Sequence, residues 1–242
     1  MTPAIVSTSD LHRTYGEGEA AVHALRGVSV DFPAGQFTAI MGPSGSGKST
    51  LMHLLAGLDR PTAGSVYVGT QDITRMSDKA LTKLRRQHIG FVFQSFNLLP
   101  TLSAEENVLL PLTIAGRKVP RETIDALLQR VGLSERRRHR PSELSGGQQQ
   151  RVAIARALIS EPTVLFADEP TGNLDSEAGA GILQLLRDAV DLDGQTTLMV
   201  THDPRAAAIA DRVLYLTDGR VVADFADPTE ADVLAQMKAV SA

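Results

Sequence analysis

The 242-residue sequence contains no cysteine. Disulfide bonds and cysteine-ligated metal sites are therefore excluded, and the absence fits a reducing cytosol. No stretch approaches the roughly 20 apolar residues that a membrane-spanning helix needs. The first ten residues lack a charged start followed by an apolar run, so we expect no signal peptide. If the protein acts at a membrane, we expect another chain to supply the part that spans it.

An excess of positive charge is also absent. The chain has 24 Lys and Arg residues against 28 Asp and Glu residues, which gives a net charge of -4. This balance predicts no overall attraction to nucleic acid or acidic lipid. The composition, 43% hydrophobic and 21% charged, is typical of a globular protein. The length fits one large domain, or a core with an inserted subdomain.

Short β-rich runs alternate with helical patterns along the chain, which indicates an α/β fold with parallel strands. Phe37–Met41, Val164–Ala167 and Thr196–Val200 are apolar at nearly every position, as strands buried on both faces are. Thr217-Asp218-Gly219-Arg220 is a hairpin turn signal. The other predicted strands are Val22–Val30, Ser65–Val68, Ile89–Phe93, Val213–Leu216 and Val221–Ala223.

Two segments have a helical pattern instead. The first runs from about Ser103 to Leu158 and predicts a helical insertion between two blocks of the α/β core. Within it, Gly132 is expected to end a helix. The apolar residues at helical spacing before that glycine are Ile124, Leu127, Leu128 and Val131. The second is a short C-terminal helix, for which Asp227 is the predicted N-cap, Pro228 the first helical residue and Glu230 the third.

Residues 42–49 match the phosphate-loop pattern G-x-x-x-x-G-K-[ST]. Glycines at these positions let backbone N–H groups curl around phosphates without side-chain clashes. Lys48 would place a charge on the β- and γ-phosphates, and the Ser49 hydroxyl would ligate Mg²⁺. A helix starting near Gly47 would aim its positive end at the same anion. The predicted ATP-binding residues here are Gly42, Ser44, Gly45, Ser46, Gly47, Lys48, Ser49 and Thr50.

Two adjacent carboxylates, Asp168 and Glu169, directly follow the predicted strand Val164–Ala167. Ligands bind at the C-terminal ends of strands in parallel sheets. Asp168 is therefore expected to hold Mg²⁺ through water, and Glu169 to polarise the attacking water as general base.

The segment Leu144-Ser145-Gly146-Gly147-Gln148 resembles the signature motif of the ABC ATPase family. The resemblance covers essentially the whole chain and implies one domain over residues 1–242. The implied fold is that of a P-loop NTPase: a RecA-like core with an antiparallel β subdomain over residues 1–94 and 159–242. A helical subdomain carrying the signature motif would be inserted over residues 95–158.

Further roles follow from this resemblance by position. Tyr15 resembles the aromatic residue that stacks on adenine, and Asp175 the residue that faces the opposite subunit. Gln94 resembles the glutamine that reaches Mg²⁺ and feels the membrane partner, and His202 the histidine that contacts the γ-phosphate. The implied catalytic residues are Lys48, Gln94, Glu169 and His202, and the implied Mg²⁺ ligands are Ser49, Gln94 and Asp168.

The resemblance also implies a homodimer that forms on ATP binding. Ser145, Gly146, Gly147 and Gln148 lie at the start of a predicted helix, which is an anion site. In the family fold this helix start is too far from Lys48 of the same chain to share a phosphate. It binds the γ-phosphate held by the partner subunit, so that each of two ATP molecules bridges two chains.

Three segments resemble one branch of the family, the LolD, MacB and FtsE types: residues 91–100, 141–151 and 169–176. Partners in this branch are integral-membrane permeases with four helices and a large extracytoplasmic domain. The resemblance implies an ATPase subunit of an ABC transporter, peripheral on the cytoplasmic face of the cell membrane. It would drive efflux or the handling of lipids or lipoproteins. A cell-division regulator of the FtsE type would share every motif, so this alternative stays open.

ABC-type ATPases that act on DNA or on ribosomes are a second class of function. The former are interrupted by long coiled coils or zinc modules and the latter carry tandem ATPase domains, and this sequence has none of these. We therefore expect no nucleic-acid partner. The basic run Arg136-Arg137-Arg138-His139-Arg140 is either a solvated loop or a contact for a permease helix or lipid headgroups.

Overall fold

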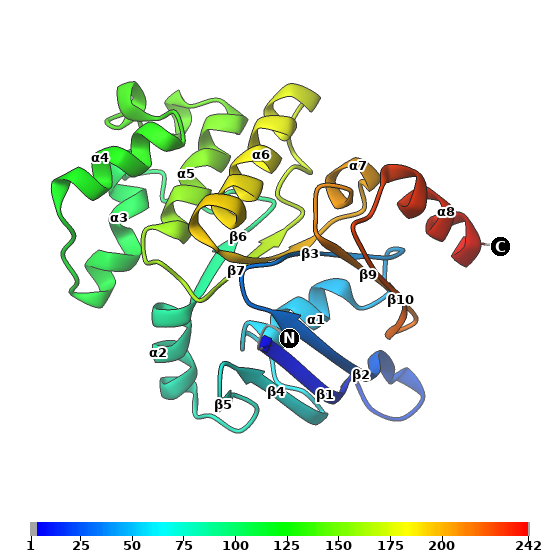
Figure 1. The fold of residues 1–242 in the computed structure, drawn as a ribbon. Coiled ribbons are helices and arrows are strands. Elements are labelled where there is room, and N and C mark those ends of the chain that lie inside the picture. Colours follow the sequence, from blue (N-terminus) through cyan, green and yellow to red (C-terminus); the bar gives the residue numbers. More distant parts are fainter. Residues whose placement is uncertain (1–3, 242) are drawn as a thin grey trace.

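The computed structural model describes residues 4–241, and Figure 1 shows its arrangement. The strands are β1 Ala4–Tyr15, β2 Val22–Pro33, β3 Phe37–Met41, β4 Ala63–Val68, β5 Gln71–Asp72, β6 Ile89–Val92, β7 Val164–Asp168, β8 Thr196–Val200, β9 Arg212–Thr217 and β10 Arg220–Ala226. The α-helices are α1 Lys48–Leu55, α2 Asp78–His88, α3 Ala104–Ala115, α4 Arg121–Arg130, α5 Gly146–Leu158, α6 Ser176–Asp193, α7 Pro204–Ala207 and α8 Glu230–Ser241. Short 3₁₀ turns lie at Gly18–Ala20, Ser134–Arg136 and Pro141–Glu143.

A six-stranded sheet in the order β10-β9-β3-β8-β7-β6 forms the centre of the molecule. All its neighbouring strands pair in parallel except β10, which pairs antiparallel with β9. Every residue of β3 and β8 is buried, as their apolar sequences predict. The predicted α/β fold with a parallel core is therefore confirmed, and β3, β7 and β8 end at the same edge of the sheet.

A second, antiparallel sheet has the order β2-β1-β4-β5. The sequence pattern does not predict its strand β1, and the register explains why. The buried residues of β1 are first two and then three positions apart, at Val6, Thr8 and Leu11. The pairing with β2 shifts between Thr8 and Leu11, and Asp10 has a φ of 47° there. A bulge of this kind breaks the two-residue alternation by which a strand is recognised.

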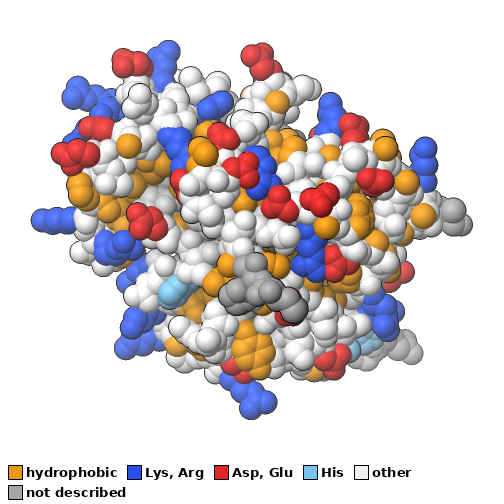
Figure 2. Space-filling view, in the orientation of Figure 1, with side chains coloured by type: hydrophobic (Ala, Val, Ile, Leu, Met, Phe, Trp, Pro, Cys, Tyr) orange, Lys and Arg blue, Asp and Glu red, His pale blue; other side chains and the backbone are white. Residues whose placement is uncertain are grey.

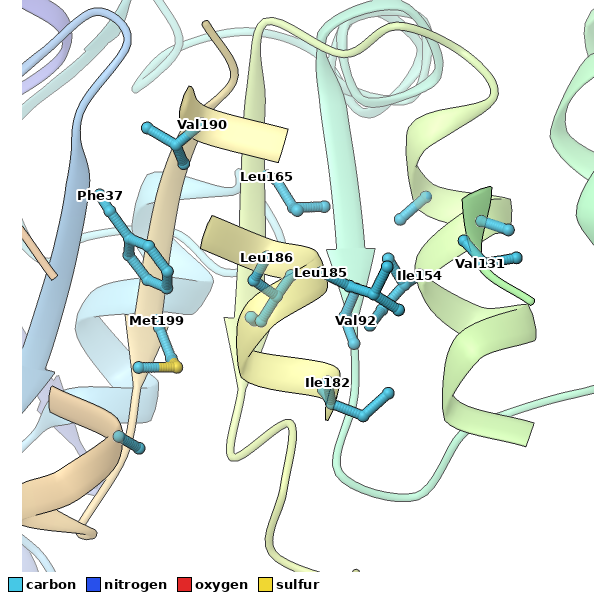
Figure 3. Close-up of a cluster of buried hydrophobic side chains, with 14 of the residues drawn as sticks. Phe37, Val92, Val131, Ile154, Leu165, Ile182, Leu185, Leu186, Val190 and Met199 are labelled. Carbon is cyan, nitrogen blue, oxygen red and sulfur yellow. The ribbon is translucent and has the colours of Figure 1, made fainter. Parts of the chain in front are cut away.

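One continuous apolar cluster joins the central sheet to the helices above it. Figure 3 shows Ile182, Leu185, Leu186 and Val190 of α6 in this cluster, together with Phe37 and Met199 from strands of the central sheet. Ile154 of α5 lies in the same cluster. Burial of a large apolar side chain stabilises a fold by about 1.5–3 kcal/mol. This packing holds the helix that begins after Ser145 firmly against the core.

Helices α3, α4 and α5 lie together at one end of the molecule (Figure 1). Ser103 begins α3 with a reciprocal capping box to Glu106. After α4, Gly132 has a φ of 70° and its N–H bonds the carbonyl of Gln129, so it ends the helix as predicted.

The predicted N-cap of the C-terminal helix is wrong. Helix α8 begins at Glu230, and Asp227 lies outside it with a φ of 47°. The cap is Thr229: its hydroxyl accepts from the N–H of Asp232 at 3.2 Å, and its own N–H donates to the Asp232 carboxylate at 3.0 Å. Two overlapping cap patterns occur in this sequence, and the threonine pairs with the acid three residues on.

The basic run 136–140 is only partly solvated. Arg137 is held between two helices, with its Nε 2.6 Å from Glu105 of α3 and a terminal nitrogen 2.7 Å from Asp125 of α4. These contacts tie down the segment that leads to Ser145. On the face shown in Figure 2, acidic and basic side chains are interspersed rather than segregated by sign. Among residues 4–241, no helix combines the length and apolarity that a membrane span requires.

Candidate functional site

The phosphate loop joins β3 to α1, and its shape depends on glycine at two places. A Cβ on Gly42 would lie 2.1 Å from the carbonyl oxygen of Leu216, and one on Gly47 would lie 2.4 Å from that of Ala24. Gly45 has a φ of 80° and nothing within 4 Å of its Cβ position, so the loop is open there. The loop is thus packed against the protein on one side and accessible on the other, as an anion cradle requires.

The β9–β10 hairpin supports this loop from beneath. The N–H of Gly219 donates to the carbonyl of Ser46 at 3.1 Å, and the Gly219 carbonyl accepts from the N–H of Arg26. Ser46 itself is buried, with its hydroxyl unpartnered among the described residues. Ser44 and Ser49 are exposed and Thr50 is half-buried. The exposed hydroxyls are therefore the ones that a ligand can reach directly.

Lys48 is the first residue of α1, and its ammonium is folded over the loop. Its Nζ donates to the carbonyls of Gly42 and Pro43, both at 2.8 Å. Burial lowers the pKa of Lys48, while the negative charges of Glu169 and Asp168 oppose that shift. The loop, its lysine and the two carboxylates at the end of β7 therefore belong to one electrostatic site.

Asp168 is the last residue of β7. Burial raises the pKa of its carboxyl, and the neighbouring Glu169 raises it further, whereas His53 and Lys48 lower it. A desolvated carboxylate of this kind lacks enough positive charge around it, which is the condition that a bound cation relieves. The arrangement fits the predicted role of Asp168 at a Mg²⁺ ion.

Replacing Asp168 by Asn should make the ligand-free protein more stable at neutral pH and should weaken the binding of Mg²⁺. A raised pKa means that the folded state binds this proton more tightly than the unfolded chain does. Protonated Asp168 therefore contributes stability at pH values below its pKa in the unfolded chain. This stability is lost as the pH rises through its pKa in the folded protein. Asn carries no charge and so removes the cost of burying an ionised carboxylate, and the midpoint of thermal unfolding at pH 7 should rise by a few degrees. The exposed Asp31→Asn is the control, and an unchanged or lower Tm for Asp168→Asn would contradict this account.

Glu169 follows Asp168 with a φ of 46°, a region that non-glycine residues rarely adopt. Its N–H is fixed by the carbonyl of Val200 at the end of β8, at 2.9 Å. Its Oε1 lies 2.9 Å from Nδ1 of His202, which follows β8. The Glu169 side chain is only 19% exposed, whereas that of His202 is 74% exposed. The structure thus pairs the predicted base with the predicted phosphate sensor.

Gln94 lies after β6, and its neighbour in space is Asn173. The Asn173 side-chain amide donates to the Gln94 carbonyl at 3.0 Å, and Gln94 Nε2 lies 3.4 Å from Asn173 Oδ1. A Cβ on Gly172 would lie 2.8 Å from Gln94 Nε2, so the two loops are in close contact. This glutamine is therefore coupled to the loop that follows Glu169.

A buried glutamine that sequence reasoning missed connects three of these segments. Gln150 of α5 has no exposed surface, and its Nε2 donates to the carbonyl of Pro170 at 2.7 Å and to that of Phe93 at 3.3 Å. Those carbonyls directly follow Glu169 and directly precede Gln94. These two bonds satisfy the buried Nε2 group, whereas Oε1 of Gln150 has no partner among the described residues. The available signal was a polar residue on the apolar side of α5.

The signature turn forms the N-terminus of α5. The Ser145 hydroxyl accepts from the N–H of Gln148 at 3.3 Å, and Gln148 Oε1 accepts from the N–H of Ser145 at 2.9 Å. The Gln148 side chain is thus used in a capping box within the chain. First-turn N–H groups, here at Gly146 and Gly147, have no intrahelical partner and remain available to an anion.

Asp175 also caps a helix. Its Oδ1 accepts from the N–H of Ala178 at 2.8 Å, at the start of α6. Residues on both sides of Asp175 pack on the signature turn: a Cβ on Gly146 would lie 3.5 Å from Leu174, and one on Gly147 would lie 3.1 Å from Ala178. The Asp175 loop and the signature turn therefore form one continuous surface.

Tyr15 stands apart from these residues, at the end of β1. The residue is 40% exposed, and its hydroxyl donates to Oδ2 of Asp59 at 2.8 Å. The guanidinium carbon of Arg13 lies 4.3 Å from the ring centroid. Asp59 and Arg13 were not predicted as site residues, because nothing in their sequence spacing marks them as neighbours of Tyr15.

The residues predicted from the sequence form two groups. Within residues 4–241, no hydrogen bond or ion pair joins the signature turn to the phosphate loop. The members of the first group, linked by contacts or by their charges, are Lys48, Asp168, Glu169 and His202. The second group consists of Ser145, Gly146, Gly147, Gln148 and Asp175. One chain therefore presents two separate candidate anion-binding elements.

The residues present suit Mg²⁺ as the metal. Within residues 4–241, no group of three or more His, Asp or Glu side chains is arranged to hold an ion. Mg²⁺ does not require such a cage, because it is usually bound by one or two protein oxygens together with phosphate oxygens and water. A hydroxyl on Ser49, an amide oxygen on Gln94 and the desolvated carboxylate of Asp168 are oxygen donors of this type.

Comparison with known proteins points in one direction. The model of the ABC transporter family matches residues 25–172. The chain is 48% identical over 219 residues to an uncharacterized ABC transporter ATP-binding protein of Thermotoga maritima, covering 90% of this chain and 93% of that protein. It is 47% identical over 226 residues to the macrolide export ATP-binding/permease protein MacB of Hyphomonas neptunium, covering 93% of this chain and 35% of that protein. The chain thus spans about a third of the length of the MacB relatives.

Solved structures give the same picture. The dimeric structure of the ATP-binding cassette MJ0796 bound to ADP and Pi matches with a TM-score of 0.84 at 43% identity, covering 93% of this chain and 99% of that one. A structure of cbiO1 from Clostridium perfringens, part of an ABC transporter complex, matches with a TM-score of 0.83 at 32% identity, covering 99% of this chain and 94% of that one.

Proposed function

We propose, since the chain belongs to the ABC transporter family and is an ATPase of that family, that it closes as a homodimer around two molecules of Mg-ATP. In this proposal each nucleotide is held by the phosphate loop of one subunit and by the signature turn of the other. Formation and hydrolysis of these two bridges close and open the dimer, and the motion drives a membrane permease.

The observation that carries the proposal is the separation of the two anion-binding elements. Lys48 shares an electrostatic site with Asp168 and Glu169, whereas Ser145 bonds only within its own turn. Helices α1 and α5, which begin at these two elements, lie in different parts of the molecule (Figure 1). The free N–H groups of the signature turn are suited to bind a phosphate. Since the phosphate loop of the same chain lies elsewhere, we propose that the phosphate they bind is held by a second chain. The cassette MJ0796, 43% identical, has been solved as a dimer.

The chemistry follows from the first group of residues. The side chain of Lys48 and the N–H groups of the loop hold the β- and γ-phosphates, and Tyr15 stacks on the adenine. A water molecule attacks the γ-phosphorus, its proton passes to the Glu169 carboxylate, and the bond to the ADP oxygen breaks to release phosphate. His202, 2.9 Å from Glu169, orients that carboxylate and contacts the γ-phosphate. Mg²⁺ would be held by Ser49, Gln94 and Asp168 and would neutralise charge on the phosphates.

The loop after Gln94 is the segment through which a change at the nucleotide site would be transmitted to the permease. Asn173 bonds Gln94 on one side, and its loop continues to Asp175 and the signature turn. Loss of the γ-phosphate would therefore alter both the dimer contact and the segment predicted to face the permease. We infer a permease with four helices and a large extracytoplasmic domain, and a position at the cytoplasmic face of the membrane.

Two processes fit this assembly. Relatives named for macrolide export favour efflux. The handling of lipids or lipoproteins, through mechanical transmission across the membrane, would use the same assembly. Signalling in cell division is the alternative that uses the same motifs. Co-purification from membranes distinguishes them, because the co-purified partner's own transport or division phenotype then decides the process.

Replacing Ser145 by Arg tests the shared site. A bulky cation at the helix start should block the partner's γ-phosphate without touching the phosphate loop. We expect unchanged ATP affinity, loss of the ATP-dependent dimer on size-exclusion chromatography, and at least a tenfold lower rate of hydrolysis. Ser134→Arg, on an exposed turn, is the matched control. Normal hydrolysis by Ser145→Arg would show that the signature turn does not act on the other subunit's nucleotide.

A further inference from the structure

The base end of the nucleotide site is built from three side chains that contact one another. Tyr15 donates its hydroxyl proton to Oδ2 of Asp59 at 2.8 Å. Arg13 Nε lies 3.0 Å from the same carboxylate oxygen. The Arg13 guanidinium lies over the Tyr15 ring, 4.3 Å from its centroid. Each member therefore touches the other two.

This triangle has two consequences for the tyrosine ring. The Arg13 guanidinium covers one face of the ring while 40% of the surface of Tyr15 remains exposed, so with Arg13 in place a base can stack only on the opposite face. Donation of the hydroxyl proton to a carboxylate enriches the ring in electrons, which strengthens its attraction for the guanidinium. The Arg13 and Asp59 side chains are only 23% and 24% exposed, so solvent screens their pairing less than at an open surface.

The triangle is also attached to the helix of the phosphate loop. Asp59 follows α1 by four residues, and its N–H donates to the carbonyl of His53 within that helix. The opposite end of α1 carries Lys48. A single short element thus connects the carboxylate that orients Tyr15 with the lysine that holds phosphate. The separation between the two ends of the site is set by a helix rather than by the turn after β1.

We propose that Asp59 and Arg13 are positioning residues for the nucleobase, which fix Tyr15 so that one open face receives the base at a set distance from the phosphate loop. This rests on the proposed function, in which Tyr15 stacks on adenine. Stacking on an aromatic face is tolerant of base identity. The pair therefore contributes affinity for a nucleoside triphosphate over a bare polyphosphate, and it contributes little to the choice between ATP and GTP.

The test compares ligands with and without a base on Asp59→Asn, Tyr15→Phe and the double variant. For Asp59→Asn, Kd and KM for ATP should rise about three- to tenfold, with a similar loss for GTP and with kcat within about twofold of the parent value. The affinity for inorganic tripolyphosphate should not change. Both substitutions act on the same hydrogen bond, since Phe removes its donor and Asn removes the charge of its acceptor, so the double variant should lose no more than the worse single variant. Arg13→Gln should likewise weaken the binding of ATP and GTP but not of tripolyphosphate. It replaces Asp59→Asn in the test if that variant folds poorly.

Asp78→Asn is the matched control, since Asp78 pairs with Arg60 beside Asp59 and its side chain is 92% exposed. Parent-like ATP affinity in both Asp59→Asn and Arg13→Gln would overturn the proposal. So would an equal loss for tripolyphosphate and ATP, which would indicate damage to the phosphate loop instead. Failure of the underlying function has a different signature: the parent protein would bind neither ATP nor tripolyphosphate.

Discussion

Replacing Glu169 by Gln should slow ATP hydrolysis by about a thousandfold while leaving ATP binding intact. The carboxylate is held by a fixed backbone and by His202, so the substitution removes the proton acceptor and little else. Without hydrolysis, the two nucleotide bridges persist. The variant should therefore accumulate as an ATP-bound dimer, and size-exclusion chromatography in the presence of Mg-ATP should show it at twice the mass of the nucleotide-free chain.

The control for this variant is Glu135→Gln. Glu135 is exposed on a short turn in the helical segment, and its loss should change neither rate nor mass. A monomeric Glu169→Gln protein at saturating ATP would contradict the bridged dimer. A variant that dimerises but hydrolyses ATP at the parent rate would instead show that another group accepts the proton.

Replacing Lys48 by Ala should weaken ATP binding by about a hundredfold and abolish measurable hydrolysis. The ammonium contacts two loop carbonyls and lies in the field of Asp168 and Glu169, so its removal deprives the phosphates of their nearest cation. Hydrogen bonds to charged groups contribute about 1.5–3 kcal/mol each, and the loss of two at the low end of that range, about 3 kcal/mol, corresponds to roughly a hundredfold. Isothermal titration with ATP in the presence of Mg²⁺ measures it.

Lys79→Ala, on the exposed surface of α2, is the control for charge removal alone. The Lys48→Ala variant should bind tripolyphosphate more weakly by the same factor as ATP, because the lysine contacts the phosphates and not the base. This is the reverse of the pattern expected for Asp59→Asn. Near-parent affinity of Lys48→Ala for both ligands would remove the lysine from its assigned role.

Much of the site could be predicted because each of its parts is local in the sequence. A glycine-rich loop between an apolar strand and a helix is typical of phosphate binding and can be recognised from eight consecutive residues. The pair Asp168-Glu169 at the end of a strand can likewise be recognised from a short stretch of sequence. The buried strands β3, β7 and β8 are recognisable because their residues are apolar throughout. Where a parallel sheet is indicated, the rule that ligands bind at strand C-termini places these parts at one edge.

The parts that could not be predicted depend on contacts between distant residues. Strand β1 is hidden by a bulge that breaks its alternation. Gln150 looks like one polar residue among three consecutive glutamines, and only the fold brings its amide to Phe93 and Pro170. The Asp59–Tyr15 bond spans 44 residues of sequence. The prediction of the N-cap of α8 fails for a different reason. Asp227 and Thr229 are both suitable cap residues, and only the pairing with Asp232 selects Thr229.

Gln150 explains how the two anion-binding elements of one chain can influence each other. Its amide lies on the helix that begins at the signature turn, and it bonds the carbonyls beside Gln94 and Glu169. A shift of α5 on engaging the partner's nucleotide would therefore reach the chain's own catalytic loop through a rigid, buried contact. The packing of Leu174 and Ala178 on the signature glycines provides a second connection.

A crystal structure of Glu169→Gln grown with Mg-ATP tests the shared nucleotide site most directly. The account predicts a symmetric dimer in which each γ-phosphate lies between Lys48 of one subunit and the Ser145 turn of the other. A γ-phosphate that faces solvent in every assembly of the crystal, or that is bound by Lys48 and Ser145 of the same chain, would contradict it.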